Sequence, residues 1–243
     1  NYQSCLVAPT EILAFQHFKN FKDKFENLGL VVKVLTGSTK SSDRKILLND
    51  LKNGSINLLI GTHAIFEQNV IFNNLGYAVI DEQHRFGVKQ RSKIWEKNNP
   101  PPHVLIMTAT PIPRTLTMSL YGDLDLSIID ELPPGRKDVI TVHRKDKNRL
   151  KVFGFIRDQI KQGRQIYIVY PLIEESKKMD LKYLEDGLES ITREFDKENY
   201  SIGVMHGRMR SSNKDIEMNN FLNGKIDILI STTVIEVGVN VPN

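Results

Sequence analysis

The sequence contains a single cysteine, Cys5, which excludes a disulfide within the chain. Cys5 lies in an apolar run, so we interpret it as a small buried side chain and expect a reducing compartment such as the cytoplasm. No apolar run approaches the ~18 residues of a membrane-spanning helix, and no signal peptide opens the chain. We therefore expect neither a disulfide-bonded secreted domain nor a membrane protein.

The chain also lacks an excess of one charge. Lys and Arg number 33 and Asp and Glu number 29, which gives a net charge of +4 and a pI near 9.0. This balance permits binding to a polyanion without requiring it, so a nucleic-acid surface would have to be local. With 243 residues, the chain is long enough for one large domain or two of about 120 residues.

Strand-like and helix-like segments alternate along the chain, which is the pattern of a parallel α/β sheet flanked by helices. Residues 4–9 predict a strand, and Thr10 predicts the cap of a helix that ends before Gly29. The apolar side chains of this helix are expected in the core: Phe15, Phe18, Phe21, Phe25 and Leu28. Further strands are predicted at 31–35, 56–60, 77–80 and 103–107, and further helices at 42–52, 88–96 and 114–120.

The proline- and glycine-rich segment 132–136 interrupts this alternation, as an interdomain linker does. We therefore predict one domain at residues 1–131 and a second at 137–243. The alternation returns in the second domain, with helices at 150–162, 181–197 and 212–222 and strands at 165–170, 201–205 and 226–230.

The two halves share an internal repeat. When residues 35–65 are laid over 205–235 without gaps, twelve of 31 positions are identical, whereas about two are expected from average residue usage. The shared unit is a loop, a helix, a strand and a threonine-bearing turn, which places Gly37 on Gly207 and Thr62 on Thr232. We expect the halves to have the same fold, although similar elements also attract similar residues.

The segment Tyr77–Ile80 predicts a buried strand that ends in Asp81-Glu82-Gln83-His84. In open α/β sheets, ligands bind beyond the carboxyl ends of strands. In phosphoryl transfer, one carboxylate holds Mg²⁺ near the phosphates and another group orients the attacking water. Such acids also commonly cap a helix start, so the pair alone leaves both interpretations open.

Other short motifs accompany this one in a fixed order. They are Ala8-Pro9-Thr10-Glu11, Gly61-Thr62-His63-Ala64, Thr108-Ala109-Thr110-Pro111, the stretch 168–176 and the stretch 232–239. In this order, they resemble motifs Ia, Ib, III, IV and V of superfamily 2 helicases. Asp81-Glu82-Gln83-His84 resembles motif II of the same proteins. The closest resemblance is to the RecG type of DNA helicase, because the segments 130–136 and 171–176 look like RecG rather than the related coupling factor Mfd.

This resemblance implies an α/β protein with two tandem RecA-like domains, mainly parallel sheets and flanking helices. It implies that Asp81 holds Mg²⁺ through water, that Glu82 positions the attacking water and that His84 relays the nucleotide state. It implies that Gln83, Thr108 and Thr110 couple the ATP site to DNA. Nucleotide-facing residues of the second domain would be Glu236, Gly238 and Asn240. Residues touching the DNA backbone would be Pro9, Thr10, Thr36, Gly37, Gly61, Thr62, His206, Gly207, Arg208, Thr232 and Thr233.

Two departures from the family pattern concern the nucleotide. Position 240 is Asn where the family usually has Asp, which removes a charge from a nucleotide or interdomain contact. The phosphate-binding loop G-x-x-x-x-G-K-[ST] and the arginine-bearing motif VI do not occur. We therefore expect a motor core truncated at the N-terminus of its first domain and the C-terminus of its second. Alone, it would lack ATPase activity and could self-associate through an exposed sheet edge.

The function that the resemblance implies is ATP-dependent remodelling of branched DNA, such as stalled forks and recombination intermediates. ATP and Mg²⁺ would be the cofactors, forked duplex DNA the partner, and the full-length protein a monomer. Two alternatives are an Mfd-like translocase and a nucleic-acid-binding module that has lost catalysis. Intact Asp81 and Glu82 argue against the second alternative.

Overall fold

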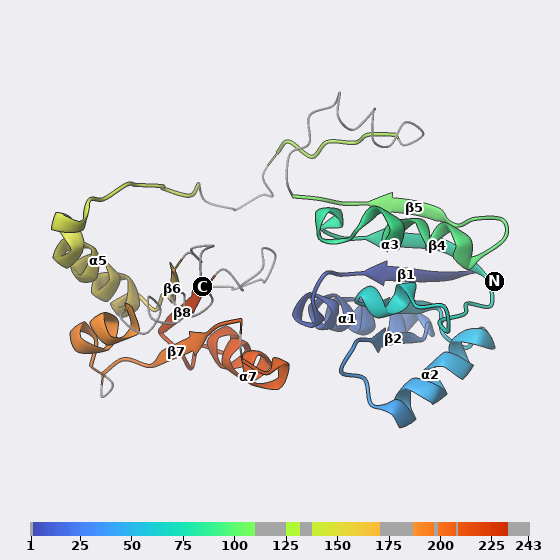
Figure 1. Ribbon diagram of the computed structural model, residues 1–243, viewed down its shortest axis with the longest axis horizontal. Helices are drawn as coiled ribbons and strands as arrows, with labels where there is room; N and C mark the ends of the chain where they lie inside the picture. The colour runs from blue at the N-terminus through green and yellow to red at the C-terminus, as the bar shows by residue number, and fades with distance from the viewer. Residues whose placement is uncertain are drawn as a thin grey trace. The chain divides into compact units, whose positions relative to one another are not determined.

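The computed structural model describes residues 2–109, 125–131, 138–170, 187–196, 199–207 and 209–232. The chain divides into two compact units, residues 1–129 and 130–243 (Figure 1). The segment 132–136 lies outside the described residues, so the domain limits at 131 and 137 stay a prediction. Among the described residues, no helix is both long and apolar enough to cross a membrane.

The first unit contains a five-stranded sheet in the order β2-β3-β1-β4-β5, in which every pair is parallel (Figure 1). Its strands are β1 (Gln3–Val7), β2 (Val32–Leu35), β3 (Leu58–Gly61), β4 (Leu75–Ile80) and β5 (His103–Ile106). Its α-helices are α1 (Glu11–Phe25), α2 (Ser41–Lys52) and α3 (Val88–Ser92). Short 3-10 helices are η1 (Glu26–Leu28), η2 (His63–Phe66), η3 (Gln83–Arg85) and η4 (Trp95–Lys97).

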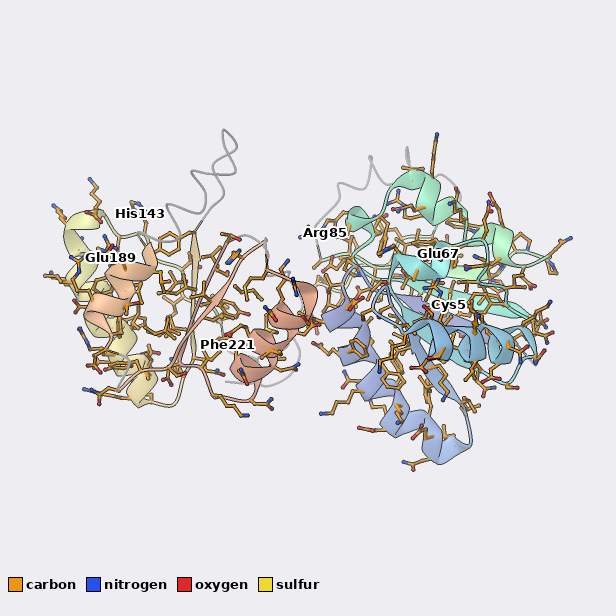
Figure 2. The ribbon with its side chains drawn as sticks, turned by 60° about the horizontal axis from the view of Figure 1, so that its bottom comes forward. Cys5, Glu67, Arg85, His143, Glu189 and Phe221 are labelled. Atoms are coloured by element: carbon orange, nitrogen blue, oxygen red, sulfur yellow. The ribbon has the colours of Figure 1, made fainter. Side chains whose placement is uncertain are left out.

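Strand β1 is the centre of this unit because both of its faces are covered. Cys5 and Val7 belong to a core cluster that includes Leu47 and Leu51 of α2. The alternate residue Leu6 packs with the apolar face of α1. Cys5, labelled in Figure 2, has 0% exposure, which confirms its interpretation as a buried side chain. This burial raises the pKa of its thiol to about 12.

Helix α1 begins as its sequence predicts, but it ends at Phe25, and η1 continues the chain to Gly29. The Oγ1 atom of Thr10 accepts a hydrogen bond from the Leu13 backbone N–H at 3.3 Å, and Gly29 follows η1 with a left-handed φ of 74°. Three phenylalanines of α1 pack against the core: Phe18, Phe21 and Phe25. The expectation was wrong for Phe15, which is 46% exposed because it lies about 100° around α1 from the buried face. It was also wrong for Leu28, which is 71% exposed in η1, beyond the end of α1.

Helix α3 ends earlier than the predicted 88–96. After Ser92 the backbone tightens, with Ile94 N–H donating to Arg91 O and Lys97 N–H donating to Ile94 O. These bonds span three residues rather than four, and they place Ile94 fully inside the core. The apolar residues of this segment therefore stabilise a turn and η4 instead of a longer helix.

The second unit contains a three-stranded parallel sheet in the order β6-β8-β7 (Figure 1). Its described elements are η5 (Asp146–Asn148), α5 (Arg149–Lys161), β6 (Ile166–Tyr170), β7 (Ile202–Met205), α7 (Ser211–Leu222) and β8 (Ile228–Thr232). Residues 187–194 are helical, which confirms that part of the predicted helix 181–197. The predicted helix 114–120 lies outside the described residues.

The repeat seen in the sequence has the same strand register in both units. Val32 of β2 pairs with Leu58 of β3, and Ile202 of β7 pairs with Ile228 of β8 at the same offset of 170 residues. The helices between these strands, α2 and α7, also begin and end at that offset. The structure therefore confirms that the two segments form one repeated β-α-β unit.

Candidate functional site

The predicted acids lie at the carboxyl end of β4, between the ends of β1 and β5. The Asp81 backbone N–H donates to Val7 O at 2.9 Å, which extends the pairing with β1. On the other side, the Gln83 backbone N–H donates to Met107 O at 3.1 Å. The sheet thus brings the segments 81–84 and 107–109 together at one edge, as expected for neighbouring parallel strands.

The Asp81 carboxylate is held on both of its oxygens. Oδ1 accepts a hydrogen bond from the Glu82 backbone N–H at 3.0 Å. Oδ2 lies 3.0 Å from Nε2 of His17, a residue of α1 that the sequence motifs did not indicate. The Asp81 side chain is 20% exposed, so it remains accessible from solvent.

Glu82 has a backbone conformation that is unusual for a residue with a side chain. Its φ of 46° and ψ of 53° lie in the left-handed region, which costs a non-glycine residue about 1–3 kcal/mol. Its Oε2 atom accepts a hydrogen bond from the Ala109 backbone N–H at 3.3 Å and lies 3.5 Å from His84 Nδ1. The same His84 nitrogen lies 3.4 Å from Thr108 Oγ1. The segments that follow β4 and β5 are therefore in direct contact.

A buried arginine supports the turn that carries Glu82. Arg91 is only 9% exposed, and its Nη1 atom donates to the backbone oxygens of Gln83 and Phe86 and to Gln83 Oε1. A buried guanidinium needs such acceptors, because an unsatisfied buried charge is costly. Arg91 fixes the position of η3 and hence of the residues on either side of it.

The arrangement of Asp81 is compatible with a Mg²⁺ ligand. Mg²⁺ is usually bound by one or two carboxylates together with waters and substrate phosphates, and a carboxylate oxygen can accept more than the single bond recorded here. The described residues contain no cluster of three or more His, Cys, Asp or Glu side chains that could hold a metal alone. Asp81 alone therefore suits a cation whose own ligands are mostly water and phosphate, with water between the carboxylate and the cation.

The residues predicted to touch DNA in the first unit differ in their exposure. Gly37 is exposed, and Pro9 and Thr10 are partly exposed. By contrast, the side chains of Thr36 and Thr62 are buried, with 1% and 2% exposure. The exposed turns at 9–10 and 37 are therefore better placed for a ligand than the buried threonines.

A carboxylate that was not among the predicted site residues connects these two turns. Glu11 Oε1 accepts a hydrogen bond from the Ser38 backbone N–H at 3.0 Å, and Oε2 accepts one from Ser38 Oγ at 2.8 Å. Inside the loop, Thr39 Oγ1 accepts from the Thr36 backbone N–H. The start of α1 and the loop 36–39 are thereby held as one surface.

In the second unit, Gly207 is exposed, His206 is partly exposed and Thr232 is buried. The Oγ1 atoms of Thr62 and Thr232 occupy matching positions of the repeat, and neither has a hydrogen-bond partner among the described residues. The other predicted residues lie outside the described ranges: Thr110, Arg208, Thr233, Glu236, Gly238 and Asn240.

Comparison with known proteins finds helicase relatives for both halves of the chain. The DEAD/DEAH box helicase family matches residues 1–119, and the helicase conserved C-terminal domain matches residues 147–243. The ATP-dependent DNA helicase RecG of Synechocystis sp. is 49% identical over 242 residues, which cover 100% of this chain and 29% of that protein. RecG of Aquifex aeolicus is 47% identical, with 99% and 30% covered. This chain is similar to RecG helicases over its whole length.

A solved structure of RecG bound to a three-way DNA junction has the same architecture. It matches with a TM-score of 0.77 and 39% sequence identity over 100% of this chain and 31% of that one. The two parallel sheets flanked by helices are therefore tandem RecA-like domains, as the motifs predicted. The chain spans about a third of the length of these RecG relatives.

Proposed function

We propose that this chain is part of the motor of an ATP-dependent DNA helicase that remodels branched DNA, including stalled forks and recombination intermediates. The observation that carries the proposal is the direct contact between the Asp81-Glu82 turn and Thr108-Ala109 at the carboxyl edge of one sheet. The RecG relatives are named ATP-dependent DNA helicases, and one was solved on a three-way DNA junction.

In this proposal, Asp81 holds the nucleotide's Mg²⁺ through water. The cation, when bound, neutralises charge that develops on the phosphates. Asp81 suits this role because bonds to both carboxylate oxygens fix its orientation while its side chain stays accessible. A preorganised ligand of this kind loses little conformational freedom when the cation binds.

Glu82 would orient the attacking water and accept hydrogen bonds from it. Its Oε2 atom is already fixed by the Ala109 N–H, so the carboxylate has a defined position before the water arrives. Because Ala109 and Thr108 follow β5, a movement of that segment would change the position of Glu82 and of His84 together. This contact is the proposed route by which nucleotide state and the predicted DNA-coupling residues affect each other.

The proposed DNA surface of the first unit is the pair of turns at Pro9-Thr10 and Gly37. Exposed backbone groups at such turns and at helix N-termini bind phosphates without many basic side chains, which suits a net charge of only +4. Glu11 keeps the two turns in a fixed relation through Ser38. Contacts of this type position a duplex without reading its sequence.

The test is Glu82→Gln in the full-length protein. We expect ATP turnover to fall by roughly 10²–10⁴-fold, because an amide cannot accept a proton from the attacking water. Affinities for nucleotide and forked DNA should stay close to those of the wild type, since the phosphate-binding groups are unchanged. Glu26→Gln, an exposed position on η1, is the matched control. Wild-type turnover in Glu82→Gln would contradict the proposed role.

The Mfd-like alternative is not favoured, because the full-chain relatives reported above are RecG proteins. A catalytically inert binding module would also retain the fold. Asp81 and Glu82 are nevertheless held in place by specific contacts, which an inert module has no need to keep.

A further inference from the structure

His17 contacts the predicted Mg²⁺-binding residue Asp81 from a helix that is distant in the sequence, α1. Its Nε2 atom lies 3.0 Å from Oδ2 of Asp81, across 64 residues of sequence. The two side chains are 22% and 20% exposed, so the bond is partly shielded from water. A hydrogen bond to a charged group in such a place is stronger than one in open solvent.

The chemistry of the pair decides which atom donates. An ionised carboxylate only accepts hydrogen bonds, so the proton of this bond is on His17 Nε2. The other carboxylate oxygen, Oδ1, takes the Glu82 backbone N–H. Asp81 is thus oriented by one donor from its own turn and one from α1, and lone pairs on both oxygens remain for water or a cation.

We propose that His17 is a positioning residue for the motor reaction: it orients Asp81 for Mg²⁺-nucleotide. This inference rests on the proposed function, since it requires Asp81 to serve the cation. It adds a residue of α1 to a site otherwise built from the segments after β4 and β5. Partners of this kind, which hold a metal ligand in place, typically contribute 10–100-fold to metal affinity.

The position of His17 on α1 also connects two parts of the proposed motor. The helix starts at Thr10, whose side chain caps it, and this turn is part of the proposed DNA surface. His17 lies seven residues further on, in the second turn of the same continuous helix. A shift of α1 on DNA binding would therefore move the donor to Asp81.

The competing explanation is that His17 only fastens α1 to the sheet. Both explanations predict some loss of stability when His17 is replaced, so stability alone does not separate them. Only the positioning role predicts a specific change in the Mg²⁺ requirement. It also predicts that a side chain with an N–H near the position of Nε2 restores the wild-type behaviour, and Gln meets that condition.

The decisive experiment measures binding of a fluorescent ATP analogue to the full-length protein at increasing Mg²⁺ concentration. His17→Ala should raise the Mg²⁺ concentration at half-maximal binding by about tenfold, and His17→Gln should return it to within about twofold of the wild type. Phe18→Leu, which alters the packing of α1 but not the bond to Asp81, is the control and should leave this concentration unchanged. DNA stimulation of turnover should fall in His17→Ala and recover in His17→Gln.

The outcomes separate this inference from the proposed function. If the wild type shows no Mg²⁺-dependent nucleotide binding, the proposed function fails. If the wild type binds normally and His17→Ala has the same Mg²⁺ requirement, only the role of His17 is overturned. Equal shifts in His17→Ala and Phe18→Leu, or a failure of His17→Gln to restore binding, would likewise overturn it. In the protein without nucleotide, Asp81→Asn should shift the ¹⁵N NMR signal of His17 Nε2 if the bond exists in solution.

Discussion

Two glycines that the motifs assign to the DNA surface have different physical roles. A Cβ atom at Gly61 would lie 2.0 Å from the backbone oxygen of Leu35, a distance at which neither backbone can stay in place. A Cβ atom at Gly37 would meet only Glu11 Oε1, at an ordinary 3.5 Å. The absence of a side chain at Gly61 is therefore a requirement of packing between β2 and β3.

We predict that Gly61→Ala lowers the free energy of unfolding of the first unit by roughly 3 kcal/mol, as overpacking does. Gly37→Ala should change it by less than about 0.5 kcal/mol, since the site is exposed. Urea unfolding followed by fluorescence of Trp95 reports on this unit, because Trp95 is the single tryptophan of the chain and packs against its core. Equal stability of the two variants would contradict the packing explanation.

At the scale of elements, a buried glutamine joins three segments of the first unit. Gln3 Nε2 donates to the backbone oxygens of Leu51 and Ile56, and Gln3 Oε1 accepts from the backbone N–H groups of Asn73 and Asn74. The side-chain amide thereby connects β1 to the end of α2, to the loop before β3 and to the loop before β4.

The second unit contains an equivalent, partly buried glutamine, Gln165. Gln165 Nε2 donates to the backbone oxygens of Phe221 and Ile226, which correspond to Leu51 and Ile56 at the offset of 170 residues. Gln165 itself corresponds to Gln3 at an offset of 162, so an ungapped comparison of the sequences could not pair the two glutamines. The duplication therefore extends to the strand beside the repeated β-α-β unit.

We expect Gln3→Ala to destabilise the first unit by roughly 3 kcal/mol, since each buried polar group left unsatisfied costs about 1–3 kcal/mol and water would satisfy only some of them. The urea transition reported by Trp95 should move to lower denaturant concentration. Gln165→Ala is the matched control, because it removes the equivalent bonds from the other unit and should leave this transition in place. A transition that moves equally in both variants would show that the two units unfold together.

For the molecule as a whole, the small net charge limits how DNA binding can arise. A charge of +4 on 243 residues gives little general attraction to a polyanion, so a few local phosphate contacts must supply it. Arg208 is the basic side chain among the residues predicted to touch the DNA backbone, and it lies outside the described ranges.

Arg208→Ala should weaken binding to duplexes of unrelated sequence by similar factors and flatten the slope of log K against log salt by about one. Arg193→Ala is the control, because that side chain is 75% exposed on a helix and pairs with Glu189. The measurement is a salt titration of affinity for forked DNA with the full-length protein. A loss confined to one DNA sequence would point to base recognition instead of a phosphate contact.

The sequence by itself determined the features that depend on local order. Alternating apolar segments and turn residues located the strands, because burial and backbone conformation act on neighbouring residues. The Thr10 cap, the Gly29 stop and the strand that ends just before Asp81 are of this kind, and the structure has all three. The offset of 170 residues also anticipated the common register of β2-β3 and β7-β8.

Only the tertiary structure decided which distant residues meet. His17 and Asp81 are 64 residues apart, and their bond exists because α1 packs beside the strand end that carries Asp81. The close approach of Gly61 to Leu35 likewise depends on β3 lying next to β2. Such contacts follow from the order of strands in the sheet and the placement of helices on it, and no local pattern of residues encodes either one.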